Sequence, residues 1–134
     1  FFKVAAERMH HLARTKRAAP AVFMVDIDHF KRVNDTLGHQ AGDQAILACA
    51  GLLRAVAGDG AVVARYGGEE FVILADQAAH GDVESFSQRL VEAARLAPPL
   101  APGYPSLTVS VGAYAMALGE TIDQGIARAD AALY

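Results

Sequence analysis

Hydrophobic residues recur along the chain with two different periods. A spacing of three or four residues is typical of amphipathic helices, and it predicts helices over residues 2–17, 42–57, 82–96 and from Thr121 to the end of the chain. Short apolar or alternating runs are typical of strands, and they predict strands over residues 21–25, 61–65, 70–75 and 107–114. The strand 21–25 is apolar throughout, which indicates burial on both faces.

Local signals support these boundaries. Pro20 ends the first helix, Gly58 ends the second, and Thr121 is the expected N-cap of the last. Gly67-Gly68 between two strands predicts a tight hairpin. The side chains expected to face the core from the two middle helices are Ile46, Leu47, Cys49, Ala50, Leu52, Leu53, Val83, Phe86, Leu90, Val91 and Ala94.

The resulting order of elements is α-β-α-β-β-α-β-α. It contains the β-α-β-β-α-β core of a ferredoxin-like arrangement, with helices on one face of the sheet. We therefore expect an α+β fold in which helices pack around an antiparallel sheet. The 134 residues suit one domain, and we expect that domain, residues 1–134, to be trimmed at both ends and to come from a longer protein.

Composition narrows the class of protein. Hydrophobic residues make up 53% of the chain and charged residues 20%, which argues against disorder. The net charge of −3 argues against a surface that grips nucleic-acid phosphates. The single cysteine excludes an internal disulfide and favours a reducing compartment. No apolar run is long enough to span a membrane, so we expect a cytoplasmic domain that makes no membrane contact itself.

Acidic residues gather at strand ends. Asp26 and Asp28 close the apolar strand, and Glu69-Glu70 follow the Gly67-Gly68 pair. Carboxylates at neighbouring strand ends are able to hold Mg²⁺, which keeps several waters and needs one or two protein carboxylates. The alternative is that these residues only begin turns or face solvent. Spacing alone supports both interpretations equally.

The residues between the carboxylates also have two interpretations. Gly67-Gly68 either supply positive φ for a turn or let a nucleotide approach the backbone. Lys31 either holds a phosphate or is simply solvated. Asn34 and Asp43 are good helix caps, yet a carboxylate also accepts the paired N–H donors of a guanine edge, which an adjacent amide can complement.

Several motifs, in the same order, resemble the GGDEF family of diguanylate cyclases. They are residues 26–35 (Asp-Ile-Asp-His-Phe-Lys-Arg-Val-Asn-Asp), Gly38-His39, Gly42-Asp43, residues 65–71 (Arg-Tyr-Gly-Gly-Glu-Glu-Phe) and residues 129–134. The pentapeptide that names the family takes its GGEEF form here. The resemblance covers essentially the whole chain. It implies a fold of the nucleotidyl cyclase and polymerase palm type, and condensation of two GTP into cyclic di-GMP with release of two pyrophosphates.

The resemblance also implies roles for individual residues. Asp26, Glu69 and the backbone carbonyl of Ile27 would bind two Mg²⁺, with Mn²⁺ as a substitute, and Glu70 would support the metal or the attacking 3′-hydroxyl. Thus Asp26, Glu69 and Glu70 form the expected catalytic set. The residues expected to bind substrate are Asn34 and Asp43 at the guanine, Lys31 with the backbone of His29 and Phe30 at the phosphates, and Gly67 and Gly68 beneath the nucleotide.

Further expectations concern partners and control. Each domain binds one GTP, so the product requires a homodimer with facing sites, regulated by attached sensory domains outside this chain. The family's inhibitory Arg-x-x-Asp motif is replaced by residues 58–61 (Gly-Asp-Gly-Ala), which predicts no feedback inhibition through that site. The alternative function is a catalytically silent GTP-binding regulatory module; a palm acting on nucleic acid is disfavoured by the acidity. The input signal, and any membrane anchor of the whole protein, are not determined by this sequence.

Overall fold

A four-stranded antiparallel sheet with the order β2-β3-β1-β4 organises the chain. The computed structural model describes residues 19–77 and 81–133. The strands are β1 (Pro20–Ile27), β2 (Ala61–Arg65), β3 (Glu70–Asp76) and β4 (Val109–Ala115). The expected α+β fold with an antiparallel sheet is confirmed, and its apolar strand β1 lies between two others, which explains its burial.

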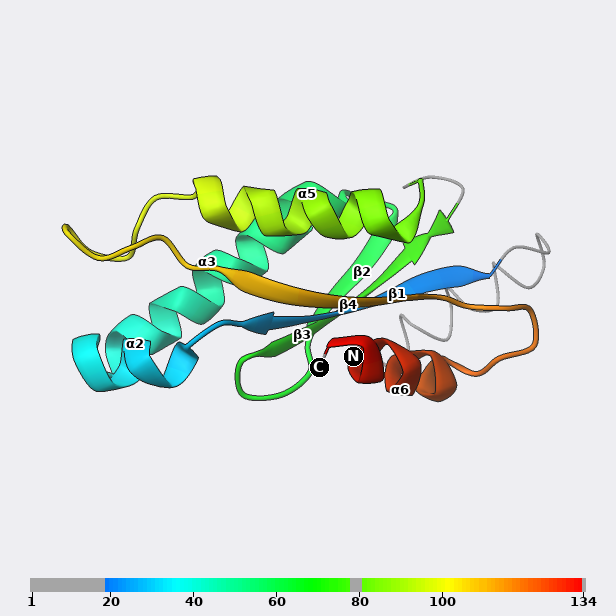
Figure 1. Cartoon of the computed structure of the whole chain (residues 1–134), viewed down its shortest axis with the longest axis horizontal. Coiled ribbons are helices and arrows are strands. Elements are labelled where there is room, and N and C mark those ends of the chain that lie inside the picture. The colour runs from blue at the N-terminus through cyan, green and yellow to red at the C-terminus, as the bar shows by residue number, and fades with distance from the viewer. Residues whose placement is uncertain (1–18, 78–80, 134) are drawn as a thin grey trace.

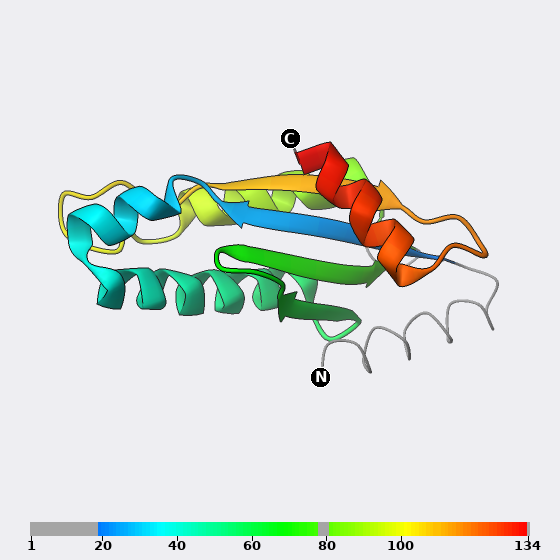
Figure 2. The ribbon, with the colours of Figure 1, turned by 90° about the horizontal axis from the view of Figure 1, so that it is seen from below.

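Helices cover both faces of this sheet (Figure 2). They are α2 (Phe30–Leu37), α3 (His39–Ala57), α5 (Val83–Leu96) and α6 (Ile122–Leu133). The helices α3 and α5 pack on the face that carries Phe23, Val25 and Phe71. The last helix, α6, packs on the opposite face, as the positions of α5 and α6 on either side of β4 in Figure 1 show. Thus α3 and α5, the helices of the predicted β-α-β-β-α-β core, share one face of the sheet as expected. The helix α6, which follows that core in the sequence, covers the other face.

Alternation along the strands creates two separate cores. Odd-numbered positions of β1 face α3 and α5, whereas Val22 and Met24 face α6 with Val72 of β3. On the α6 side Gly112 has no room for a side chain, because a Cβ there would lie 2.3 Å from the carbonyl oxygen of Ala129. The absence of a side chain at Gly112 therefore lets the backbone of α6 lie directly against β4.

The structure corrects several expectations about the elements. The helix α2 was not predicted, because its eight residues are mostly polar and it buries only Val33 fully. Leu47 and Val91 are 73% and 38% exposed, so their expected place in the core is wrong. Both lie beside the buried stripe of their helix and not within it. The predicted helix 2–17 lies outside the described residues.

Other local predictions are confirmed. Thr121 caps α6, since its Oγ1 accepts a hydrogen bond from the N–H of Gln124 at 3.1 Å. Cys49 is buried in the α3–α5 core, and burial raises the pKa of its thiol to about 12. None of the described helices is both apolar enough and long enough to cross a membrane.

Candidate active site at the end of strand β1

The predicted carboxylates meet where β1 ends and β3 begins. Asp26 pairs with Glu70 across the two strands. The N–H of Ile27 donates to the carbonyl oxygen of Glu69 at 3.2 Å, which extends the ladder by one further bond. The register therefore brings Asp26, Ile27, Glu69 and Glu70 to one end of the sheet, as the strand-end spacing suggested.

Asp26 and Glu70 lie on the face that carries α6. They stand two residues beyond Met24 and Val72, which pack against that helix. The helix α6 runs across this face of the sheet in both views (Figures 1 and 2).

The pKa of Glu70 is raised above its ordinary value. Partial burial of the carboxyl is the main cause, followed by the negative charges of Asp26, Asp130 and Glu69. Asp130, on α6, was not predicted to act at this site, although it belongs to the terminal motif; only the packing of α6 brings it near Glu70. Acidic groups from β1, β3 and α6 thus converge on one locus.

This locus suits a hard divalent cation. The Oδ1 atom of Asp26 is buried, Glu69 and Glu70 are half-buried, and a cation would relieve the mutual repulsion that Glu70 experiences. The described residues contain no cluster of three or more acidic, histidine or cysteine side chains arranged around a metal position. Mg²⁺ does not require one, because it is commonly held by one or two carboxylates, waters and substrate phosphates. The donor set therefore fits Mg²⁺.

The Gly67-Gly68 hairpin does not owe its glycines to backbone conformation. Neither residue is among the glycines with positive φ, so the interpretation based on a positive-φ turn is wrong. A Cβ on Gly68 would meet no atom within 4 Å, and one on Gly67 would lie 3.2 Å from Oε1 of Glu70. Packing within the protein therefore does not explain Gly68, whereas the approach of a ligand would.

Arg65 supports this hairpin from its own strand. Its guanidinium donates to the carbonyl oxygen of Gly68 through Nη2 at 2.6 Å and to that of Gly67 through Nε at 3.1 Å. The N–H of Tyr66 donates to the carbonyl oxygen of Glu70 at 2.7 Å. The carbonyl oxygens of the turn thus accept hydrogen bonds from within the protein. A ligand that lies over the turn would therefore contact glycines whose backbone is already held in place.

The expected nucleotide-reading residues lie on α2 and α3. Asn34 on α2 packs against Gly42 on α3 so closely that a Cβ at Gly42 would lie 1.8 Å from the Oδ1 of Asn34. Asp43, the next residue on α3, is exposed. The structure thus brings the amide of Asn34 beside the turn of α3 that carries the Asp43 carboxylate, which leaves both able to meet one ligand edge.

The residues expected at the phosphates stand at the start of α2. His29 has a left-handed backbone (φ 56) and is exposed, as is Lys31, whereas Phe30 is half-buried. The carbonyl oxygen of His29 accepts the N–H groups of Arg32 and Val33. The chain therefore turns at His29 and begins α2 immediately after the carboxylate end of β1.

Asp28 is directed toward β4. Its Oδ2 accepts a hydrogen bond from Oγ1 of Thr108 at 2.8 Å, and its Oδ1 accepts one from Oγ of Ser110 at 2.6 Å. Neither hydroxyl was predicted to take part. The signal was present, because alternate positions of a strand lie on one face, but the pairing of β4 with β1 was needed to connect them to Asp28.

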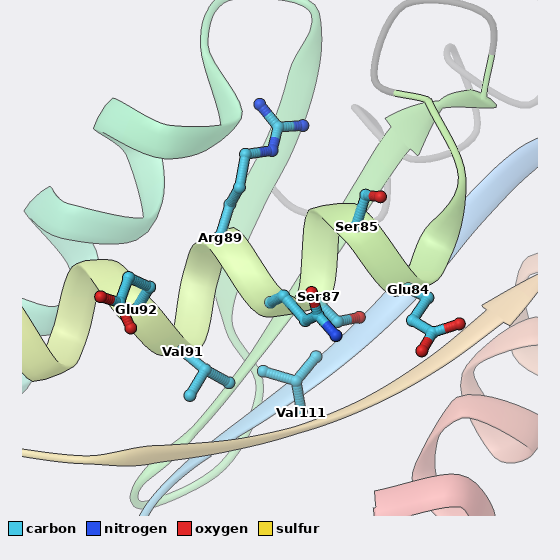
Figure 3. A pocket seen from close by; sticks show the side chains of 8 residues that line it. Glu84, Ser85, Ser87, Arg89, Val91, Glu92 and Val111 are labelled. Atoms are coloured by element: carbon cyan, nitrogen blue, oxygen red, sulfur yellow. The ribbon is translucent and has the colours of Figure 1, made fainter.

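A pocket elsewhere on the molecule shares none of these residues. It lies between α5 and β4 and is lined by Arg89, Val91 and Val111 with polar side chains of α5 (Figure 3). Val111 packs with the core on the α3–α5 side, whereas Asp26 and Glu70 lie on the α6 side. This pocket is therefore separate from the carboxylate site.

Comparison with known families identifies the chain. Residues 1–134 match the family described as "Diguanylate cyclase, GGDEF domain". The chain belongs to the GGDEF family. The GGEEF hairpin and the carboxylates described above therefore belong to a GGDEF domain.

Named relatives of this GGDEF domain differ in the function that their names state. The chain is 43% identical to the cyclic di-GMP phosphodiesterase NbdA of Pseudomonas aeruginosa over 94 residues, which are 69% of this chain and 12% of NbdA. It is 35% identical to the diguanylate cyclase DgcM of Escherichia coli K12, covering 95% of this chain and 30% of DgcM. The chain thus spans less than a third of either relative.

A solved structure has the same fold. The active GGEEF domain of a diguanylate cyclase from Vibrio cholerae superimposes with a TM-score of 0.84 at 26% identity, covering 95% of this chain and 81% of that one. The sheet and helices described here are therefore those of a GGDEF domain.

Proposed function

We propose that this GGDEF domain is an active diguanylate cyclase, which condenses two GTP into cyclic di-GMP and releases two pyrophosphates. The observation that carries the proposal is the GGEEF hairpin. Its residues Gly67 and Gly68 are not required by backbone conformation, and Asp26, Glu69 and Glu70 stand beside them at one end of the sheet. A triphosphate lying over the two glycines would have its phosphates close to these carboxylates.

In this proposal the carboxylate end of the sheet holds two Mg²⁺, or Mn²⁺, through Asp26, Glu69 and the carbonyl oxygen of Ile27. When bound, such ions neutralise phosphate charge and activate the attacking oxygen. The protein supplies position: the ladder bond from Ile27 to Glu69 holds two of the ligating residues side by side. Glu70, with its raised pKa, lies next to them and supports the metal or the attacking 3′-hydroxyl.

Substrate recognition is assigned to the α2–α3 pair. The carboxylate of Asp43 accepts the two N–H donors of the guanine edge and the amide of Asn34 complements them, while Lys31 neutralises the terminal phosphates. The close contact between Asn34 and Gly42 supports this assignment, because it holds the amide against the helix that carries Asp43. The backbone of His29 and Phe30 completes the phosphate side.

Because one domain holds one GTP, the reaction needs two domains whose sites face each other across a two-fold axis. We further propose that attached sensory domains control this pairing, and that the protein acts in the cytoplasm, where GTP is made. Feedback inhibition through the region of residues 58–61 is not expected. Gly58 there has a φ of 75 and ends α3, a conformation in which an arginine would be strained.

The test is turnover of GTP by the protein in a dimerised form with Mg²⁺, followed by chromatography of the products. The wild-type protein should form cyclic di-GMP, and Glu69→Gln should abolish it. Glu84→Gln, which changes an exposed glutamate on α5, is the matched control and should leave the rate unchanged. Product formation that survives Glu69→Gln would contradict the proposed role of that residue.

The second candidate function is a silent GTP-binding module that regulates an attached domain. It is kept because NbdA, a relative at 43% identity, is named as a phosphodiesterase. GTP binding by the dimerised wild-type protein with no cyclic dinucleotide formed would select this function and reject the first.

A further inference from the structure

Asp28 makes a set of contacts that joins two distant parts of the chain. Both of its carboxylate oxygens accept hydroxyl hydrogen bonds, from Thr108 at 2.8 Å and from Ser110 at 2.6 Å. Its N–H donates to the carbonyl oxygen of Thr108 at 2.9 Å. Bonds to an ionised acceptor are stronger than neutral ones, so these bonds hold the residue that follows β1 firmly to the start of β4.

The residues on either side of Asp28 belong to the proposed site. Ile27 precedes it and is held to Glu69 through its own N–H. His29 follows it in a left-handed conformation, which is disfavoured for residues other than glycine and persists only where neighbouring contacts enforce it. A rotation of the chain at Asp28 would therefore move the carbonyl oxygen of Ile27 and the start of α2 together.

The start of α2 is held by apolar packing of Phe30 against the core, and not by a side-chain hydrogen bond at its N-cap. No side chain caps its N-terminus, and His29 occupies the cap position. Asp28, one residue earlier, adds side-chain hydrogen bonds between the entry of α2 and the sheet. The direction in which Lys31 leaves the first turn of α2 depends on these bonds.

We propose that Asp28 is a positioning residue: bonded to Thr108 and Ser110, it fixes the turn between β1 and α2 so that the metal-binding carbonyl of Ile27 and the phosphate-binding turn are preorganised. The inference rests on the proposed function of the same site. In this scheme Asp28 acts through the backbone on either side of it, while one of its oxygens is bonded to Thr108 and the other to Ser110. Preorganisation of this kind strengthens binding by removing an ordering cost.

The experiment removes the hydroxyls and leaves Asp28 in place. Binding of a non-hydrolysable GTP analogue with Mg²⁺ is measured by calorimetry for Thr108→Val/Ser110→Ala, for Asp28→Ala and for the triple variant. Each is expected to raise the Kd roughly tenfold or more, and the triple variant should be no weaker than Asp28→Ala. Thr108→Ser, which keeps the hydroxyl, should bind as wild type does.

A matched control separates positioning from stability. Asp82→Ala removes another aspartate that accepts bonds from a serine, at the N-cap of α5, so it should lower the Tm but leave the Kd unchanged. Binding is measured well below the Tm of every variant. If Asp28→Ala does not fold, the single variants Thr108→Val and Ser110→Ala, which change an exposed and a half-buried hydroxyl, carry the test.

Two outcomes would overturn the inference. Loss of binding in Asp28→Ala with a normal Kd in Thr108→Val/Ser110→Ala would mean that Asp28 contacts the ligand directly. An unchanged Kd with a lower Tm in all variants would mean that it only stabilises the fold. A wild-type protein that binds no GTP analogue would instead refute the proposed function, and the inference with it, so the two failures are distinguishable.

Discussion

Gly42 shows how the absence of one side chain shapes the proposed guanine site. It lies in the first turns of α3, where a Cβ would clash with the Oδ1 of Asn34. A helix interior usually disfavours glycine relative to alanine by about 0.5–1 kcal/mol. The close contact with Asn34 accounts for the glycine, because it keeps the amide against α3 next to Asp43.

Gly42→Ala should therefore weaken GTP binding by displacing the amide of Asn34. Gly51→Ala on the same helix is the matched control, since a Cβ there meets no atom within 4 Å. We expect the first substitution to raise the Kd for GTP about tenfold, the order of one lost hydrogen bond to the ligand, and the second to leave it unchanged. Calorimetry with a non-hydrolysable analogue measures both, and equal Kd values for the two variants would show that Asn34 does not read the base.

At the level of elements, the position of α6 depends on how closely it approaches β4. At Gly112 the nearest atoms are backbone atoms of α6, the carbonyl oxygen of Ala129 and the N–H nitrogen of Leu133. Backbone atoms cannot rotate away as a side chain can, so an added methyl group must move the helix. Since α6 carries Asp130, whose charge acts on Glu70, such a movement would also alter the carboxylate site.

Gly112→Ala is expected to destabilise the fold by about 1–3 kcal/mol through overpacking. Gly51→Ala, at an exposed helical position, should instead stabilise it by about 0.5–1 kcal/mol. Urea denaturation measures both changes through the midpoint. An unchanged midpoint in Gly112→Ala would contradict the direct backbone contact between α6 and β4.

Glu120 gives the connection between β4 and α6 a dependence on pH. Its Oε1 accepts hydrogen bonds from the hydroxyl of Tyr114 and from the N–H of Ala117, both at 2.7 Å. The pKa of Glu120 is lowered below its ordinary value, mainly by the bond from Tyr114 and then by that from Ala117. A carboxyl with a lowered pKa in the folded state stabilises the fold while it is ionised.

The stabilisation by Glu120 is therefore complete above the ordinary pKa of a glutamate and is lost as the pH falls through the lower value in the folded protein. Glu120→Gln should lower the Tm at neutral pH, and the difference in Tm from the wild-type protein should shrink as the pH falls below the ordinary pKa of a glutamate. Thermal unfolding followed by circular dichroism across this range measures the difference. A difference in Tm that is the same at every pH would show that the charge of Glu120 contributes nothing.

At the scale of the whole molecule, the proposed reaction requires two copies of the site. If these residues pair only weakly by themselves, the rate per molecule must depend on the protein concentration, because the fraction of paired domains follows mass action. We expect the specific activity to rise on concentration and to become constant once a dimerising segment is fused. A specific activity that stays constant over about a 100-fold dilution without that segment would contradict a weakly paired dimer.

Periodicity predicted most elements because each buries an apolar stripe against the sheet. It failed at α2, where Phe30, Val33 and Leu37 do stand at helical spacing, because the helix has only eight residues and most of them are polar. It also overstated the buried stripes of α3 and α5, since Leu47 and Val91 stand at their edges and the width of contact depends on the neighbouring elements. The motifs and their spacing predicted Asp26 and Glu69 as site residues, and this prediction did not depend on knowing which helix faces are buried.

The amino-acid sequence by itself determined the strands, the hairpin, the family motifs and the residue types available at the site, because these depend on local period and chemistry. The tertiary structure alone decided which groups meet. Strand register placed Asp26 opposite Glu70, the face occupied by α6 brought Asp130 close to them, and the pairing of β4 with β1 directed Asp28 toward two hydroxyls. Alternation assigns a residue to a face of its own strand, but strand order and register, which arise from contacts distant in sequence, choose its partners.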